Sequence, residues 1–122
     1  MQIIERFLRA RERKKLANPQ YDFLYEPHPD EMVSFDCETT SLDVKEAEII
    51  SIGAVNIRGS EILTSESFYV LVTPDGLMQA ANVKVHGLRP KDLSDGIPVE
   101  EAVYQLLDFI GGRPLVGYYL EY

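Results

Sequence analysis

The sequence predicts an α/β domain in which helices cover a mixed β-sheet. Three segments carry this prediction. Residues 32–38 alternate apolar and polar side chains, residues 48–57 are apolar at almost every position, and residues 99–110 repeat apolar side chains with a helical period. The first two patterns are typical of strands, and the third is typical of an amphipathic helix.

The N-terminal segment, residues 2–16, predicts an amphipathic helix. It has an apolar stripe formed by Ile3, Ile4, Phe7 and Leu8, and most of its arginines lie on the other side. Three roles stay open: docking on the domain through the stripe, contact with nucleic acid, and binding of a membrane or partner. Residues 18–30 contain three prolines and predict an extended connector. The chain thus divides into an N-terminal helix with its connector, residues 1–31, and a domain, residues 32–122.

Three strands are predicted next. Residues 32–38 form a strand with one apolar and one polar face, and residues 48–57 form a central strand covered on both sides. Residues 67–73 are predicted to pair with the central strand in a hairpin, after a turn at residues 58–60. The short connections make neighbouring strands antiparallel.

The helix of residues 99–110 begins after Pro98 and ends at Gly111 and Gly112. A fourth strand, residues 114–119, follows. The helical crossover places this strand parallel to the third strand, and therefore to the first. The sheet is predicted to be mixed.

The composition fits one small domain, because the chain has 122 residues, of which 45% are hydrophobic and 26% charged. Cys37 has no second cysteine with which to form a disulfide. No apolar run is long enough for a membrane span or a secretory leader, so we expect a cytoplasmic protein.

The charge is unevenly distributed. Residues 1–15 carry six basic and two acidic side chains, or +4, whereas the whole chain carries −8, so the rest carries −12. An acidic body binds nucleic acid poorly unless divalent metal ions or the basic N-terminal segment supply positive charge.

Asp36 and Glu38 lie on the same face of the first predicted strand, with Cα atoms about 6.6 Å apart. Two carboxylates at this spacing repel by about 0.6 kcal/mol in water and by about 2.5 kcal/mol at an effective dielectric constant near 20. Two interpretations stay open from the spacing alone. The pair is either a solvated strand face or a site for magnesium or manganese, which prefer oxygen ligands.

The stretch VSFDCETTSLDVKEAEIISIGAV, residues 33–55, resembles the first motif of the DEDD, or DnaQ-like, 3′-to-5′ exonucleases. In that family Asp-x-Glu ends the first strand, threonines follow, and an Ile-Gly-Ala-Val strand comes next. Three further segments match in order: VHGL at residues 85–88, the amphipathic helix, and LVGYYLEY at residues 115–122, which is similar to the start of the second motif. The resemblance covers residues 32–122.

The resemblance implies an RNase H-like fold and hydrolysis of phosphodiester bonds at the 3′ ends of single-stranded DNA or RNA. Asp36 and Glu38 would be catalytic and would hold two Mg²⁺ or Mn²⁺ ions. Thr39 and Thr40 would bind the terminal sugar, and Leu42 would contact its base. The alternatives are turn-forming roles for the threonines and core packing for Leu42.

Other residues receive structural interpretations. Cys37 points to the apolar face and is expected to be a small buried side chain. His86 lies outside the position of the family's catalytic histidine, and His28 is assigned no role. Ser41 stands where the family usually has glycine, and Tyr118 and Tyr119 stand where a His-Asn pair is common; the tyrosines either pack or stack on bases.

The family uses four carboxylates and a histidine, and residues 1–122 match only the first two carboxylates. We therefore expect a C-terminally incomplete, truncated exonuclease domain that is inactive or nearly so on its own. An exposed sheet edge would favour a homodimer. The alternative function is a non-catalytic interaction module that uses this edge or the N-terminal helix. The sequence does not choose between DNA and RNA, nor among proofreading, repair and RNA turnover.

Overall fold

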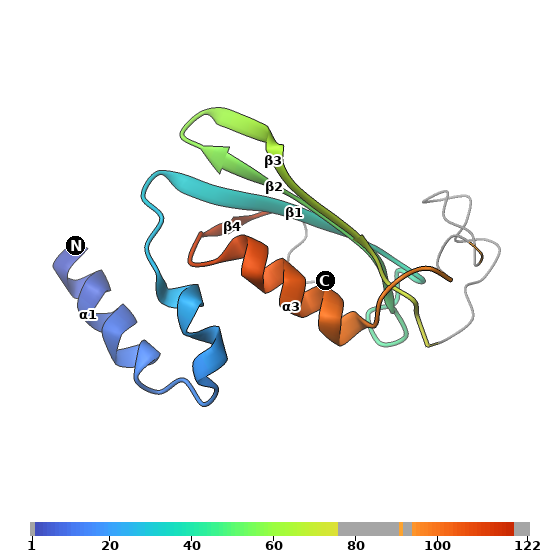
Figure 1. Cartoon of the computed structure of the whole chain (residues 1–122), viewed down its shortest axis with the longest axis horizontal. Coiled ribbons are helices and arrows are strands. Elements are labelled where there is room, and N and C mark those ends of the chain that lie inside the picture. Colours follow the sequence, from blue (N-terminus) through green and yellow to red (C-terminus); the bar gives the residue numbers. More distant parts are fainter. Residues whose placement is uncertain (1, 76–90, 92–93, 119–122) are drawn as a thin grey trace.

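A computed structural model describes residues 2–75, 91 and 94–118 of the chain. Four strands form one sheet in the order β3-β2-β1-β4, and helix α3 lies along one face of it (Figure 1). The elements in chain order are α1 (Gln2–Arg13), the 3₁₀ helix η1 (Pro19–Tyr25), β1 (Glu31–Thr39), β2 (Ile49–Arg58), β3 (Glu61–Leu71), α3 (Val99–Ile110) and β4 (Leu115–Val116).

The predicted strand directions are confirmed. β2 pairs antiparallel with β1 and with β3, so it is a central strand, as its continuous apolar sequence predicts. β4 pairs in parallel with β1, where Val33 lies opposite Leu115. The mixed α/β sheet is therefore the one that the sequence predicts.

Two strands differ in length from the prediction. β3 begins at Glu61, six residues before the predicted start at Ser67. The polar residues 64–66 form a bulge between the paired residues Leu63 and Ser67, and the strand continues through it. β4 is limited to Leu115–Val116, within the predicted range of 114–119.

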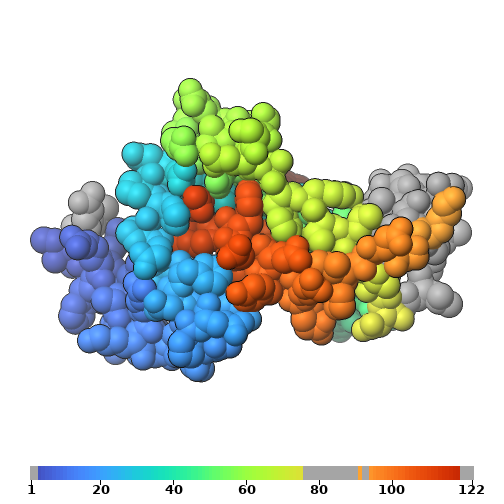
Figure 2. All heavy atoms as spheres, in the orientation of Figure 1, coloured from blue at the N-terminus to red at the C-terminus, as the bar shows by residue number. Residues whose placement is uncertain are grey.

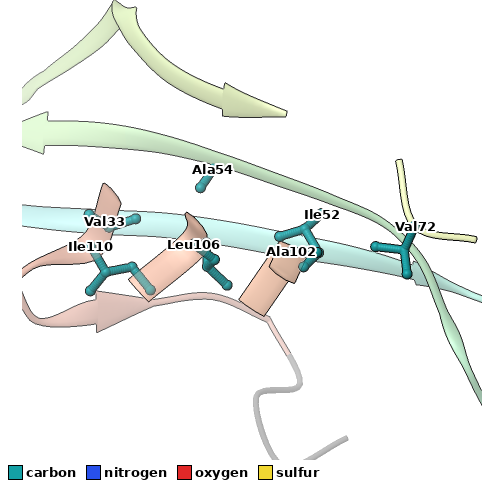
Figure 3. Packing of buried hydrophobic residues seen from close by; sticks show 7 residues of the cluster. All are labelled: Val33, Ile52, Ala54, Val72, Ala102, Leu106 and Ile110. Atoms are coloured by element: carbon teal, nitrogen blue, oxygen red, sulfur yellow. The ribbon is translucent and has the colours of Figure 1, made fainter. Parts of the chain in front are cut away.

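The core lies between the sheet and α3 (Figure 3). Ala102, Leu106 and Ile110 project from one face of α3, because they recur at intervals of four residues. They pack against Val33 of β1, Ile52 and Ala54 of β2, and Val72. Phe35 and Cys37 pack beside this cluster, so the apolar face predicted for β1 is the face that α3 covers.

The N-terminal region departs from the sequence analysis in two ways. Docking of α1 on the domain through its apolar stripe, one of the three roles left open, is wrong, because Ile3, Ile4 and Phe7 are at least 65% exposed. Instead, the Arg13 guanidinium holds α1 through ion pairs with Asp22 and Glu26. The connector is also not fully extended, because Asn18 caps the 3₁₀ helix η1 by accepting a hydrogen bond from the Gln20 N–H. None of the described helices is long and apolar enough to cross a membrane.

Candidate functional site

Asp36 and Glu38 lie on the sheet face opposite α3, near the end of β1. The alternation of the strand requires this placement, since Phe35 and Cys37 face the core. Across the β1–β2 ladder, Asp36 is opposite Gly53 and Glu38 is opposite Ser51. These two small residues leave the carboxylates without a bulky neighbour on the adjacent strand.

The two carboxylates are accessible, and no residue that the structure describes is bound to them. Asp36 is exposed and Glu38 is half-buried. Neither makes a hydrogen bond or an ion pair with any residue that the structure describes. Their charges act on the thiol between them: burial, and then the neighbouring Asp36 and Glu38, raise the pKa of Cys37 above its ordinary value. The thiol is thus kept protonated, as expected for a small core-facing side chain.

The strand pairing changes directly after Glu38. Glu38 pairs with Ser51 but Thr39 pairs with Ile49, so a β-bulge leaves Ile50 without a partner on β1. Bulges re-aim the side chains that follow them and are frequent beside active sites. Thr40 then closes the loop, because its N–H donates to the Glu48 carbonyl at 2.9 Å and its Oγ1 accepts from the Glu48 N–H at 3.0 Å.

Side-chain hydrogen bonds to the backbone hold the loop after the bulge. Thr39 Oγ1 donates to the Ser41 carbonyl at 2.8 Å, Ser41 Oγ accepts from the Asp43 N–H, and Asp43 accepts from the Lys45 N–H. Leu42 is 86% exposed within this loop. Core packing, the alternative considered for Leu42, is therefore wrong.

The threonines take part in the turn that was considered as their alternative role. Thr40 is 8% exposed and its hydroxyl already accepts a backbone hydrogen bond, so its hydroxyl is a structural group here. Thr39 is half-buried and its hydroxyl also bonds the backbone. Substrate contact by either residue stays a prediction.

The donor set at Asp36 and Glu38 fits a hard divalent cation. Mg²⁺ typically binds one or two carboxylates, keeps several waters, and takes further oxygens from substrate phosphates. Two unpartnered carboxylates on one strand face meet that requirement. Among the described residues, no group of three or more His, Cys, Asp or Glu side chains could hold a metal ion.

The remaining candidates are apart from this site or outside the described residues. His28 Nδ1 lies 3.4 Å from Glu31 Oε2 at the start of β1, at the other end of the strand from Glu38. Tyr118 is 96% exposed. His86, the VHGL segment and Tyr119 lie outside the described part of the chain.

Sequence reasoning missed three contributors to the site geometry: Glu48, Ser51 and Gly53. A signal for two of them was present, because placing the Ile-Ser-Ile-Gly stretch antiparallel to β1 puts Ser51 and Gly53 on the carboxylate face. Glu48 had no signal, because it acts on Thr40 through its main chain.

Comparisons with known proteins find relatives in sequence and in fold. The model of a family described as exonuclease, RNase_T, matches residues 33–121. The epsilon subunit of DNA polymerase III from Aquifex aeolicus is 32% identical over 89 residues, which are 73% of this chain and 43% of that protein. The PolC-type DNA polymerase III from Caldanaerobacter subterraneus is 34% identical over 88 residues, 72% of this chain and 6% of that protein. The chain therefore spans less than half the length of these relatives.

Solved structures share the fold at low identity. An exonuclease I from Methylocaldum szegediense superposes with a TM-score of 0.65 at 16% identity, over 73% of this chain and 20% of that one. The cell-death related nuclease CRN-4 superposes with a TM-score of 0.58 at 20% identity, over 66% of this chain and 29% of that one. These neighbours confirm the RNase H-like exonuclease fold.

Proposed function

The chain belongs to the RNase_T exonuclease family, and from this membership we propose that its domain removes nucleotides from the 3′ ends of DNA or RNA by metal-dependent hydrolysis. The observation that carries the proposal is the carboxylate pair Asp36 and Glu38 near the end of β1, to which none of the described residues is bound. The pair lies in the segment where the sequence matches the family motif.

In the proposed reaction, water attacks the terminal phosphodiester, the bond to the 3′ oxygen of the preceding nucleotide breaks, and a nucleoside 5′-monophosphate leaves. Two divalent ions would supply the activation of water and the stabilisation of the leaving oxygen. Asp36 and Glu38 are the residues that would hold these ions. The chain's own contribution is charge and placement, because both side chains project from a rigid strand.

The loop of residues 39–48 is proposed to receive the terminal nucleotide. Its hydrogen bonds fix the backbone of Thr39 and Thr40 beside the carboxylates, where we place the terminal sugar. Leu42 supports this role through its exposure, because an apolar side chain held in solvent can cover a base without rearrangement.

We also propose that residues 1–122 alone bind metal weakly and hydrolyse nucleic acid poorly. Two ions carry four positive charges, and the pair Asp36 and Glu38 offers two negative charges. The described residues bring no third ligand to the pair. A single weakly held ion is the expected state of this chain.

The test uses the protein as its own gene encodes it and a single-stranded oligonucleotide labelled at its 5′ end. We expect Mn²⁺ to produce a ladder of products shortened one nucleotide at a time from the 3′ end. The D36N/E38Q variant should lose this activity and keep its fold. Shortening from the 5′ end, or full activity in the variant, would contradict the proposal.

A second function is favoured by one observation. The apolar stripe of α1 is exposed to solvent, which suits a non-catalytic interaction module that binds a partner through this helix. Metal-dependent hydrolysis distinguishes the two functions, since an interaction module should have none. The homodimer stays a prediction, and sedimentation of the chain would test it.

A further inference from the structure

A groove of about 740 Å³ lies beside α1, away from the carboxylate pair. One wall is formed by Glu5, Arg6, Arg9, Ala10 and Arg13 of α1, and the other is formed by residues 25 and 27–29 of the connector together with Gly112 and Pro114. Figure 2 shows α1 in dark blue against the lighter blue of the connector. The contacts between α1 and η1 support this arrangement.

The orientation of α1 is the reverse of what an amphipathic helix usually adopts. Residues 5, 6, 9, 10 and 13 share one face of the helix, and this polar face lines the groove. The apolar stripe lies on the opposite face and is exposed. Burial of apolar surface therefore does not explain why α1 stands where it does.

The ion pairs that hold α1 use Arg13 and do not involve two other arginines of the helix. Arg13 is bound by Asp22 and Glu26, and these hydrogen bonds raise the pKa of its guanidinium above the ordinary value. Arg6 and Arg9 make no ion pair with any residue that the structure describes, although they line the same groove. They are three positions apart, which places them as neighbours on the helix surface.

We propose that this groove binds the phosphate backbone of single-stranded nucleic acid through Arg6 and Arg9, as a second contact distant from the hydrolytic site. The inference rests on the proposed function for the identity of the anion. The body of the chain carries −12 and repels nucleic acid, so the affinity must come from metal ions or from the +4 of residues 1–15. Arginine suits phosphate through its planar, bidentate donor geometry, and Tyr25 in the same groove offers a face for a base.

Figure 1 shows α1 and η1 on the side of the sheet that α3 covers, and η1 contacts both helices. The groove beside α1 is lined by residues 27–29, which precede β1. Asp36 and Glu38 lie further along β1 and on its other face, because they alternate with the core-facing Phe35 and Cys37. Asp36 is five positions after Glu31, so the offset along β1 is roughly 17 Å. A nucleic-acid chain bound in the groove is thus held at a point several nucleotides from its reacting 3′ end. Tethering raises the local concentration of the 3′ end at the carboxylates.

A lipid surface is the less suitable ligand for these arginines. A membrane would meet the exposed apolar stripe on the opposite face of α1, and the groove arginines would point away from it. Nucleic acid enters a groove as a single extended chain. The two ligands can be separated because they require opposite faces of α1.

The experiment measures binding of a fluorescein-labelled single-stranded oligonucleotide by anisotropy across a range of salt concentrations. The chain is used in EDTA, so that metal binding at Asp36 and Glu38 plays no part. The variant is R6Q/R9Q. The matched control is R11Q/K14Q, which removes two charges that do not line the groove, one near the end of α1 and one directly after it. Circular dichroism checks that both variants keep their helices.

We expect R6Q/R9Q to weaken binding and to lower the slope of log K against log salt by about 1.4, because two single-strand phosphates are lost. The control should keep the slope of the unaltered chain. Equal losses in both variants, no loss in R6Q/R9Q, or no binding by the unaltered chain would overturn the proposal. Binding to anionic phosphatidylserine vesicles but not to the oligonucleotide would also overturn it.

The result is independent of the hydrolysis test. If oligonucleotide binding does not depend on Arg6 and Arg9 while 3′ hydrolysis depends on Asp36 and Glu38, only the proposed groove contact is wrong. If binding depends on Arg6 and Arg9 while the gene product has no nuclease activity, the proposed catalytic function is wrong and the groove stands.

Discussion

Asp36 and Glu38 are two like charges held together on a strand without a partner to offset them. No described lysine, arginine or histidine forms an ion pair with either carboxylate. Glu31 differs from this pair, because Arg58 binds one of its carboxylate oxygens and Arg113 binds the other. This difference from Glu31 fits the proposal that the pair binds an external cation.

Removal of this repulsion should stabilise the domain while it abolishes function. The D36N/E38Q variant is expected to unfold at a temperature roughly 2 to 5 °C higher, because about 0.6 kcal/mol of repulsion in water is relieved. Thermal unfolding without added metal measures the effect. The E46Q/D108N variant removes two exposed, well-separated charges and should change little. A destabilised D36N/E38Q chain would show that the carboxylates have structural partners.

Glu31 gives the fold a dependence on acid. The hydrogen bond from Arg58, and then the charges of Arg113 and Arg58, hold the pKa of the Glu31 carboxyl below its ordinary value. A depressed pKa stabilises the folded state fully above the ordinary glutamate value of about 4.3, and this contribution is lost as the pH falls toward the folded value.

Urea unfolding at a series of pH values tests this linkage. The unaltered chain should lose stability steeply below about pH 4.3, and E31Q should show a shallower decline over the same range. Equal declines in the two proteins would show that Glu31 is not coupled to Arg58 and Arg113 in the folded state.

At the scale of elements, the periodicity of the side chains predicts which faces of the helices and strands are buried. It does not predict bulges or strand ends, which depend on main-chain pairing. The core faces of β1 and α3 follow from alternation and from the four-residue spacing of Ala102, Leu106 and Ile110. The early start of β3 does not follow, because its residues 64–66 are polar and exposed, and the strand persists through pairing of residues on either side of a bulge. The alternation of apolar and polar residues likewise does not predict the bulge after Glu38, although the Asp-x-Glu spacing places the two carboxylates on one face.

The sequence also did not predict that α1 turns its polar face toward the rest of the chain, and the reason is different. Its apolar stripe predicts burial, but the ion pairs of Arg13 with Asp22 and Glu26 join segments that are distant in sequence. Amphipathic period gives the faces of a helix and does not state which face meets the protein.

Gly112 sets how closely the C-terminal end of α3 approaches the connector. A Cβ at this position would lie 1.7 Å from the Glu26 carbonyl oxygen, so main chain would have to move. We expect G112A to cost about 1–3 kcal/mol and to displace the connector that lines the groove. Chemical denaturation measures the cost. G53A is the control, because its Cβ would meet Tyr69 at an ordinary 3.9 Å. Equal stability of G112A and the unaltered chain would contradict this packing.

At the scale of the whole molecule, charge and metal chemistry are coupled. The acidic body disfavours nucleic acid, the basic N-terminal segment offsets this at one end, and a divalent ion at Asp36 and Glu38 would offset it at the other. The fold supports this division because the carboxylates and the groove lie on different sides of the sheet. The family resemblance predicted the fold and the carboxylate pair, whereas the groove required the structure.

Mn²⁺ binding measured by electron paramagnetic resonance tests the proposal that Asp36 and Glu38 are the metal-binding part of a nuclease site. The chain of residues 1–122 is predicted to bind one Mn²⁺ weakly, and the D36N/E38Q variant is predicted to bind none at the same concentrations. Unchanged Mn²⁺ binding in the variant, or two tightly bound ions in the unaltered chain, would contradict the account.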